Sequence, residues 1–278
     1  MSKTPANDFV LRPFEGLPGE PDWVAFREIV PAATGTARTT KKYGGKDVAV
    51  VTMLPGGFAA MNRPDGTILL AVQGALASTD LSRDLAGALL EAIDAEPGTA
   101  IVGKPAPEGP RLQEVLDPKV PFEVTVHDNY EFWVDATAER TAEMDESLAE
   151  AAESTIPTVR LSSVEHAYWC DMGKRFVRWA RTEDEDDVVA ALARLHAKRE
   201  SAMKLADGGE ARFLGMFRAA GLVVPVWELP ADTEAADVEQ PAAELGKRLE
   251  AALKVTDPLD ANERRAKAGI VSRQVTLR

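Results

Sequence analysis

The stretch 165–187 constrains the fold more than any other part of this chain. Apolar or aromatic and basic residues alternate through Phe176–Arg181, which is the period-two pattern of a half-buried strand. Gly173 lies just before it, at the turn of a predicted hairpin. The residues Thr182–Glu185 match a capping box and predict a helix with Val188, Leu192 and Leu195 on its buried face.

The rest of the chain predicts a mixture of strands and helices. Strands are expected over Thr34–Thr39, Asp47–Leu54, Thr67–Gln73, Pro121–His127, Tyr130–Val134, Pro157–Val164, Leu222–Leu229 and Ser272–Arg278. Helices are expected after Asp80 and over Thr141–Ser154, Phe213–Ala220, Ala242–Leu253 and 258–268. Short glycine-containing turns between the first strands favour antiparallel pairing. The predicted fold class is therefore α+β, with antiparallel-dominated sheets and flanking helices.

The segment Gly103–Pro110 is the best linker candidate, because Pro105, Pro107 and Pro110 cannot donate a hydrogen bond to a sheet. We expect an N-terminal α+β domain over residues 10–104 and a C-terminal α+β domain over 111–278. A strand, a loop and a helix over 67–93 resemble those over 222–252, so two related halves are one interpretation. The usual arrangement of strand–loop–helix units explains the likeness equally well.

Charge and composition narrow the class of protein. The chain has 278 residues, of which 45% are hydrophobic, and 32 Lys and Arg stand against 45 Asp and Glu, for a net charge of −13. Such an acidic surface repels nucleic acid and anionic lipids at long range, so we expect neither as a partner.

With one cysteine no intramolecular disulfide can form, and the first residues lack the apolar core of a signal peptide. No apolar run is long enough to span a bilayer. We therefore expect a soluble, acidic, cytoplasmic protein.

The nearest approach to a catalytic set is His166, Cys170 and Asp171. On a strand, positions 166 and 170 face the same side, and a histidine beside a cysteine can activate the thiol. This keeps open an alternative function, a cysteine-dependent enzyme acting on an acyl or thioester substrate. The favoured interpretation is a buried structural thiol, because no catalytic signature surrounds the cysteine and free cysteines are commonly buried.

No metal or cofactor site is predicted. The histidines His127, His166 and His196 are scattered and lack metal-ligand spacing. The acids at 183–187 suit the first turn of a helix. None of the glycine pairs forms a phosphate-binding loop.

A basic cluster surrounds Trp179 on this otherwise acidic chain. Its members, the candidates for partner binding, are Lys174, Arg175, Arg178, Trp179 and Arg181. An exposed tryptophan between arginines would suit a protein partner. In the favoured alternative, Trp179 belongs to the core and the arginines pair with the acids at 183–187. With no convergent catalytic set, we expect a non-catalytic protein-interaction or scaffold module rather than an enzyme, and its oligomeric state is left open.

Five segments together resemble one known family. They are Arg12–Trp23, Ser82–Ala86, Ala167–Cys170, Arg178-Trp179 with Glu183–Asp186, and Gly221–Leu229. The family is an uncharacterised one of high-GC Gram-positive bacteria, known as a domain of unknown function, and the resemblance covers roughly 12–255. It implies a cytosolic protein and adds no activity. Many members begin with a long Lys/Arg-rich arm, whereas this chain starts almost directly at the folded part, so the resemblance does not support an arm-dependent contact with nucleic acid or ribosomes.

Overall fold

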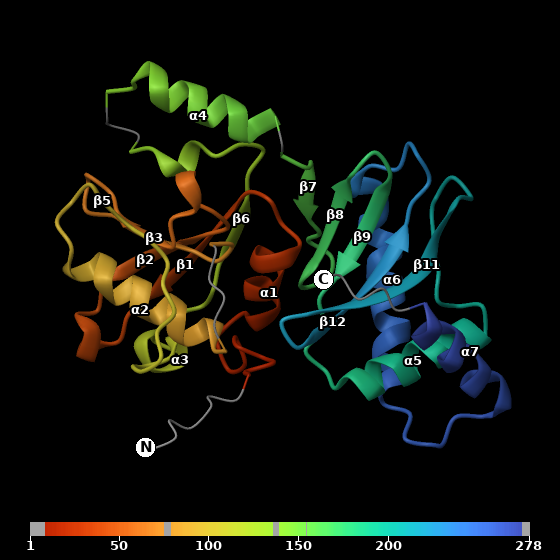
Figure 1. Cartoon of the computed structure of the whole chain (residues 1–278). Helices are drawn as coiled ribbons and strands as arrows, with labels where there is room; N and C mark the ends of the chain where they lie inside the picture. Colours follow the sequence, from red (N-terminus) through yellow and green to blue (C-terminus); the bar gives the residue numbers. More distant parts are fainter. Residues whose placement is uncertain (1–8, 75–78, 136–138, 154, 274–278) are drawn as a thin grey trace. The chain divides into compact units, whose positions relative to one another are not determined.

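The computed structural model describes residues 9–74, 79–135, 139–153 and 155–273. The chain divides into two compact units, Met1–Thr155 (unit 1) and Ile156–Arg278 (unit 2). Each unit contains a six-stranded, mostly antiparallel sheet with flanking helices (Figure 1). This confirms the α+β class predicted from the alternating strand patterns and short turns.

The sheet of unit 1 has the order β5-β3-β4-β2-β1-β6. Its neighbours are antiparallel except β2 and β4, which run parallel. The strands are β1 (Ala33–Arg38), β2 (Asp47–Val51), β3 (Ala60–Asn62), β4 (Ile68–Ala71), β5 (Thr99–Ile101) and β6 (Val124–Val126). All four residues of β4 are buried, as expected for a strand covered on both faces.

Helices cover unit 1's sheet on both faces. They are α1 (Glu20–Glu28), α2 (Leu81–Asp94), the short α3 (Leu112–Val115) and α4 (Ala142–Glu153). Helix α2 packs against β3, β4 and β5. The opposite face holds an apolar cluster in which Leu69 and Ala71 of β4 meet Tyr130, Trp133 and Leu148.

Unit 2 has the sheet order β10-β11-β12-β9-β8-β7, with every neighbouring pair antiparallel. Its strands are β7 (Thr158–Arg160), β8 (Ala167–Asp171), β9 (Arg175–Trp179), β10 (Met203–Lys204), β11 (Glu210–Ala219) and β12 (Leu222–Glu228). Its helices are α5 (Glu185–Ala197), α6 (Ala235–Leu253) and α7 (Ala261–Ser272). A single apolar cluster joins these helices to Trp169, Trp179 and Trp227 of the sheet.

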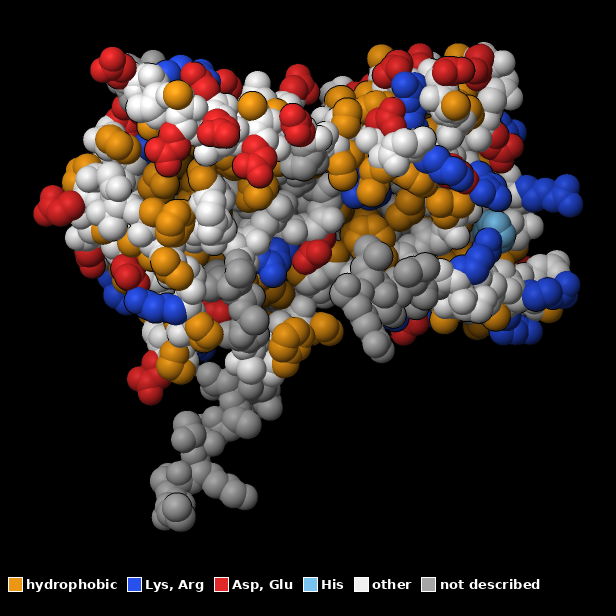
Figure 2. Space-filling view, turned by 45° about the horizontal axis from the view of Figure 1, so that its top comes forward, with side chains coloured by type: hydrophobic (Ala, Val, Ile, Leu, Met, Phe, Trp, Pro, Cys, Tyr) orange, Lys and Arg blue, Asp and Glu red, His pale blue; other side chains and the backbone are white. Residues whose placement is uncertain are grey.

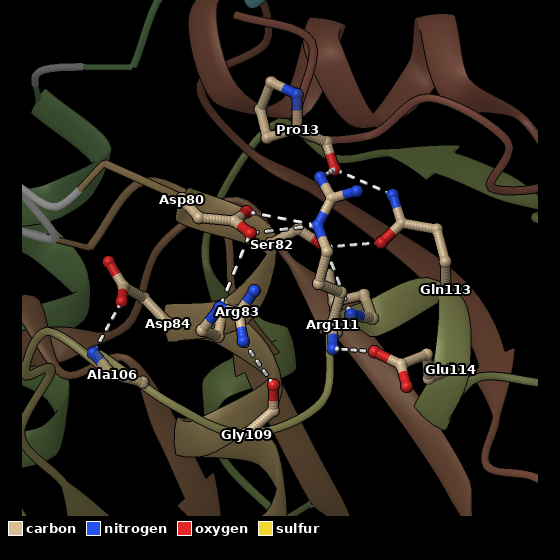
Figure 3. Close-up of polar contacts among 11 residues, drawn as sticks. Pro13, Asp80, Ser82, Arg83, Asp84, Ala106, Gly109, Arg111, Gln113 and Glu114 are labelled. Atoms are coloured by element: carbon tan, nitrogen blue, oxygen red, sulfur yellow. Dashed lines mark hydrogen bonds and ion pairs between the residues drawn. The ribbon is translucent and has the colours of Figure 1, made fainter. Parts of the chain in front are cut away.

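The Pro-rich segment 103–110 lies within unit 1, and the chain divides into its two compact units after Thr155. Side chains near the start of α2 hold this segment (Figure 3): Asp84 accepts the Ala106 N–H at 2.7 Å, and Arg83 donates to the Gly109 carbonyl at 2.6 Å. Beyond it, β6 pairs with β1. The segment has the composition of a linker, and its backbone is held by the buried Asp84 carboxylate and the half-buried Arg83 guanidinium.

The residues Phe213–Ala220, predicted as a helix, belong instead to strand β11. A register shift between Phe213 and Gly215 interrupts the two-residue alternation of β11, so its apolar residues imitate helical spacing. Ala220 and Gly221 both have positive φ, 43° and 83°, and form the two-residue turn into β12. The prediction of Leu222–Leu229 as a central strand is confirmed, because β12 lies between β11 and β9.

Two smaller predictions also differ, and a third is not tested. Glu131–Trp133 forms a 3-10 helix rather than a strand, which places Tyr130 and Trp133 on one face of the apolar cluster. Helix α5 is capped by Asp184, whose carboxylate accepts the Asp186 N–H at 2.8 Å, rather than by Thr182. The predicted strand after 272 lies largely outside the described residues.

Candidate functional site

Unit 2 contains a groove of about 540 Å³ beside helix α6, which we call the α6 groove. Three segments build it: the loop 162–166 before β8, the end of β9 with residues 180–183, and one side of α6. The lining residues on α6 are Ala243, Gly246, Lys247 and Glu250. The sheet and the helix of one compact unit therefore meet at this groove.

The floor of the groove is apolar and depends on a glycine. A Cβ atom at Gly246 would lie 3.3 Å from Cη2 of Trp179 and 3.4 Å from Cγ1 of Val164. The absence of a side chain therefore lets α6 approach the indole closely. Trp179 is only 3% exposed and belongs to the core of unit 2, where it lies 6.2 Å from Trp227 between ring centroids. Its outer edge nevertheless lines the groove.

The rim is polar and carries both charges. The Arg181 guanidinium lies 5.0 Å from the centroid of the Trp179 ring and forms an ion pair with Glu183. This cation–π contact and the pair hold Arg181 beside the floor with its charge compensated. By contrast, Lys247 and Glu250 form no ion pair with any residue in the described part of the chain.

A carboxylate from α6 fixes the loop at the other side of the groove. Glu239 accepts the backbone N–H groups of Ser162 at 2.9 Å and of Ser163 at 2.8 Å, and the Ser162 hydroxyl at 3.0 Å. Burial acts to raise the pKa of Glu239, but these donors outweigh it and leave the pKa below its ordinary value. Glu239 is therefore ionised near neutral pH and anchors the loop to the helix.

The structure separates the three candidate catalytic residues. His166 lines the groove, but its φ of 60° is left-handed and it precedes β8, so strand alternation does not extend to it. Cys170 lies in the middle of β8 and is fully buried. Burial raises the pKa of its thiol, and the nearby Arg178 only partly opposes this. Asp171 accepts the Gly173 N–H in the hairpin turn and pairs with Arg175 at 3.3 Å.

The basic cluster is also divided by the structure. Trp179 and Arg181 line the groove, whereas Lys174 pairs with Glu228 at 2.8 Å and Arg175 pairs with Glu234 at 2.9 Å. Arg178 lies opposite Tyr168 and Val226 in the sheet, on the face away from Trp179. Over unit 2, at the right of Figure 2, lysine and arginine side chains lie among acidic and apolar ones. The surface of unit 2 therefore carries charges of both signs.

The lining of the α6 groove is chemically mixed, with hydroxyl groups, one histidine and charged side chains around an apolar floor. It offers an indole edge, small residues on a helix, and charges of both signs, while the chain's single thiol lies outside its lining. No cluster of three or more histidine, cysteine, aspartate or glutamate residues that could hold a metal ion occurs within the described residues. Among the helices of the described residues, none has the length and apolar character needed to span a membrane.

Sequence reasoning found the strand side of the groove and missed its helix side. Ala243, Gly246, Lys247 and Glu250 were not singled out, although α6 was predicted over Ala242–Leu253. The available signal was Gly246, because a glycine in the interior of a helical pattern costs stability and often marks a close packing contact.

Comparison with known proteins gives one match. No curated protein and no solved structure is detectably similar to the chain. The model of a family of unknown function, DUF5926, matches residues 13–278, which is nearly the whole chain. The protein therefore belongs to the family of unknown function DUF5926.

Proposed function

We propose that this protein is a non-catalytic protein-interaction module of the cytoplasm, and that its α6 groove receives a segment of another protein. The observation that carries the proposal is the groove itself, with an aromatic edge at its floor and uncompensated charges at its rim. Tryptophan edges and charged groups of this kind are typical of protein interfaces. The net charge of −13 argues against nucleic acid as the partner.

The uncompensated groups on α6 support a binding role in particular. Lys247 and Glu250 are exposed, three residues apart, and project on one side of the helix beside the groove. A partner that supplies opposite charges would gain orientation and specificity from them. The buried, protonated thiol of Cys170 makes no corresponding contribution to a catalytic role.

The test is a substitution that fills the groove without removing its floor. Ala243→Trp adds a large side chain at a half-buried lining position, and Ala251→Trp places the same side chain at an exposed position of α6 outside the lining. Peptides are selected by display on the unmodified protein and their affinities are measured for both variants. We expect Ala243→Trp to weaken binding by more than about tenfold and Ala251→Trp to leave it within about twofold.

Two outcomes would contradict the proposal. One is that the selection enriches no peptide above the background of an unrelated protein. The other is that the selected peptides bind the Ala243→Trp variant as tightly as the unmodified chain, since the groove would then be a feature of packing only.

A further inference from the structure

Helices α2 and α6 carry the same short pattern, glycine, two residues, then Leu-Glu-Ala. It occupies Gly87–Ala92 in α2 and Gly246–Ala251 in α6. The glycine and the glutamate are four residues apart, so they lie on the same side of each helix. We call this side the Gly–Glu face of the helix.

In unit 1 another segment of the chain contacts the Gly–Glu face, although Glu91 stays exposed and Gly87 half-buried. A Cβ atom at Gly87 would lie 3.4 Å from the Ala106 methyl group, and Lys104 pairs with Glu91 at 2.6 Å. The Asp84 carboxylate, one turn before Gly87, accepts the Ala106 N–H (Figure 3). Pro105 and Pro107 flank Ala106 and restrict the backbone of this segment, which lies outside any helix or strand. A lysine- and proline-containing segment therefore binds this face through one methyl contact, one ion pair and one backbone hydrogen bond.

In unit 2 the Gly–Glu face borders an open groove. Gly246 and Glu250 both line the α6 groove, together with Ala243, which is one turn before the glycine as Asp84 is in α2. The indole edge of Trp179 and the side chain of Val164 approach Gly246 here. An aromatic-lined groove is the usual docking surface for proline-rich segments, which lose little conformational entropy when they bind.

The charges in the groove favour a basic segment. The acidic lining residues Glu165, Glu183 and Glu250 outnumber the cations Arg181 and Lys247. Arg181 is already paired with Glu183, and Glu250 forms no ion pair within the described residues. Glu250 is therefore placed to pair with a lysine or arginine of a partner, as Glu91 pairs with Lys104.

We infer that the α6 groove binds a proline-rich segment of a partner protein that carries a basic residue. The partner's prolines would lie against the edge of Trp179 and Val164, and its basic side chain would pair with Glu250. This inference rests on the proposed function and adds the chemical class of the partner segment.

The test measures binding of a labelled synthetic peptide, Ala-Lys-Pro-Ala-Pro-Ala, to the full chain by fluorescence anisotropy. Two further peptides replace the lysine with glutamate or both prolines with glycine. Glu250→Lys reverses the charge in the groove, and Glu244→Lys makes the same change at an exposed position of α6 outside the lining.

We expect the lysine–proline peptide to bind the unmodified chain. Its affinity should fall about tenfold with Glu250→Lys and stay within about twofold with Glu244→Lys. The glutamate peptide should bind the Glu250→Lys variant better than the unmodified chain, because the ion pair is restored in reverse. Replacing the prolines with glycine should weaken binding, because the flexible peptide loses more entropy.

If Glu250→Lys and Glu244→Lys lowered the peptide affinity equally, the effect would be one of long-range charge and the inference would be wrong. Undiminished binding of the glycine peptide would also overturn it. Both α6 positions are exposed, so a circular dichroism spectrum suffices to show that the variants are folded. If display instead returns peptides that depend on Ala243 but lack proline and basic residues, this inference fails while the proposed function stands.

Discussion

The two units have a similar arrangement of strands, but the helix that follows these strands has different neighbours in each unit. Four neighbouring strands have the order β3-β4-β2-β1 in unit 1 and β11-β12-β9-β8 in unit 2. Along the chain, helix α2 follows β4 and helix α6 follows β12. The pairing direction differs, because β2 and β4 are parallel whereas β9 and β12 are antiparallel. The chain directions of the two halves therefore do not match strand for strand.

Helices α2 and α6 differ in what lies against their Gly–Glu faces. The Gly–Glu face of α2 is contacted by the segment 103–110, which the side chains of Arg83 and Asp84 hold in place (Figure 3). On α6 the corresponding residues border the groove. The same short sequence pattern therefore has different neighbours in the two units: a loop segment in unit 1 and a groove in unit 2.

The largest expected effect concerns the floor of the α6 groove. Trp179→Ala should lower the free energy of unfolding by about 3–5 kcal/mol, because the ring is 3% exposed and packs in the core of unit 2. Urea unfolding followed by circular dichroism measures this loss. A loss below about 1 kcal/mol would mean that Trp179 is a surface residue, and the groove would then lack a rigid floor.

The next effect concerns the segment 103–110, which contacts helix α2 in unit 1. Asp84 is 1% exposed and accepts the Ala106 N–H, so Asp84→Ala should cost about 1–3 kcal/mol by leaving the half-buried Ala106 N–H without its acceptor. The variant should also be cut faster by protease within 103–110. Asp94→Ala removes an exposed acid at the end of the same helix and serves as the control. Equal cleavage of both variants would show that Asp84 does not hold the segment.

A smaller effect compares the two glycines directly. Alanine is favoured over glycine in a helix by about 1 kcal/mol, but a methyl group forced against a packed ring costs about 1–3 kcal/mol. At Gly87 the neighbour is the Ala106 methyl group, at an ordinary van der Waals distance of 3.4 Å from the added Cβ atom, whereas at Gly246 it is the core indole of Trp179, at a tighter 3.3 Å. The free energy of unfolding of the Gly246→Ala variant should therefore be about 1–2 kcal/mol lower than that of the Gly87→Ala variant. The opposite ranking, measured by thermal unfolding, would argue against a rigid groove floor.

The smallest effect concerns the thiol. Burial raises the pKa of Cys170 in the folded chain, so the thiol stays protonated near pH 7. As pH rises, the thiol of the unfolded chain ionises first, at a pKa of about 8.5, while the thiol of the folded chain is still protonated. The contribution of Cys170 to the free energy of unfolding is therefore fully present below that pKa and is lost as pH rises above it. Iodoacetamide should label the native protein slowly at pH 7. Rapid labelling there would support the cysteine-dependent enzyme instead.

The sequence predicted those elements whose local pattern agrees with their packing. The β8–β9 hairpin, strand β12 and helix α2 are examples, because alternation or an apolar stripe identifies their buried faces. It failed for β11, where the irregularity near Gly215 disrupts the alternation. At 103–110 the sequence could not show that side chains from α2 hold the backbone, because those residues are distant along the chain. For the groove, Trp179 and Arg181 were visible locally, whereas Gly246 and Glu250 gain their role only when α6 packs beside β9.

We propose that the α6 groove is an open binding surface whose floor is the edge of Trp179. This proposal can be tested by labelling the five tryptophans with 5-fluorotryptophan and titrating the lysine–proline peptide under fluorine NMR. Trp169 and Trp227 donate their indole N–H groups to buried backbone carbonyls and do not line the groove, so they serve as internal references. We predict that the Trp179 resonance shifts while those of Trp169 and Trp227 stay in place. A saturable shift of another tryptophan with Trp179 unchanged would contradict the account.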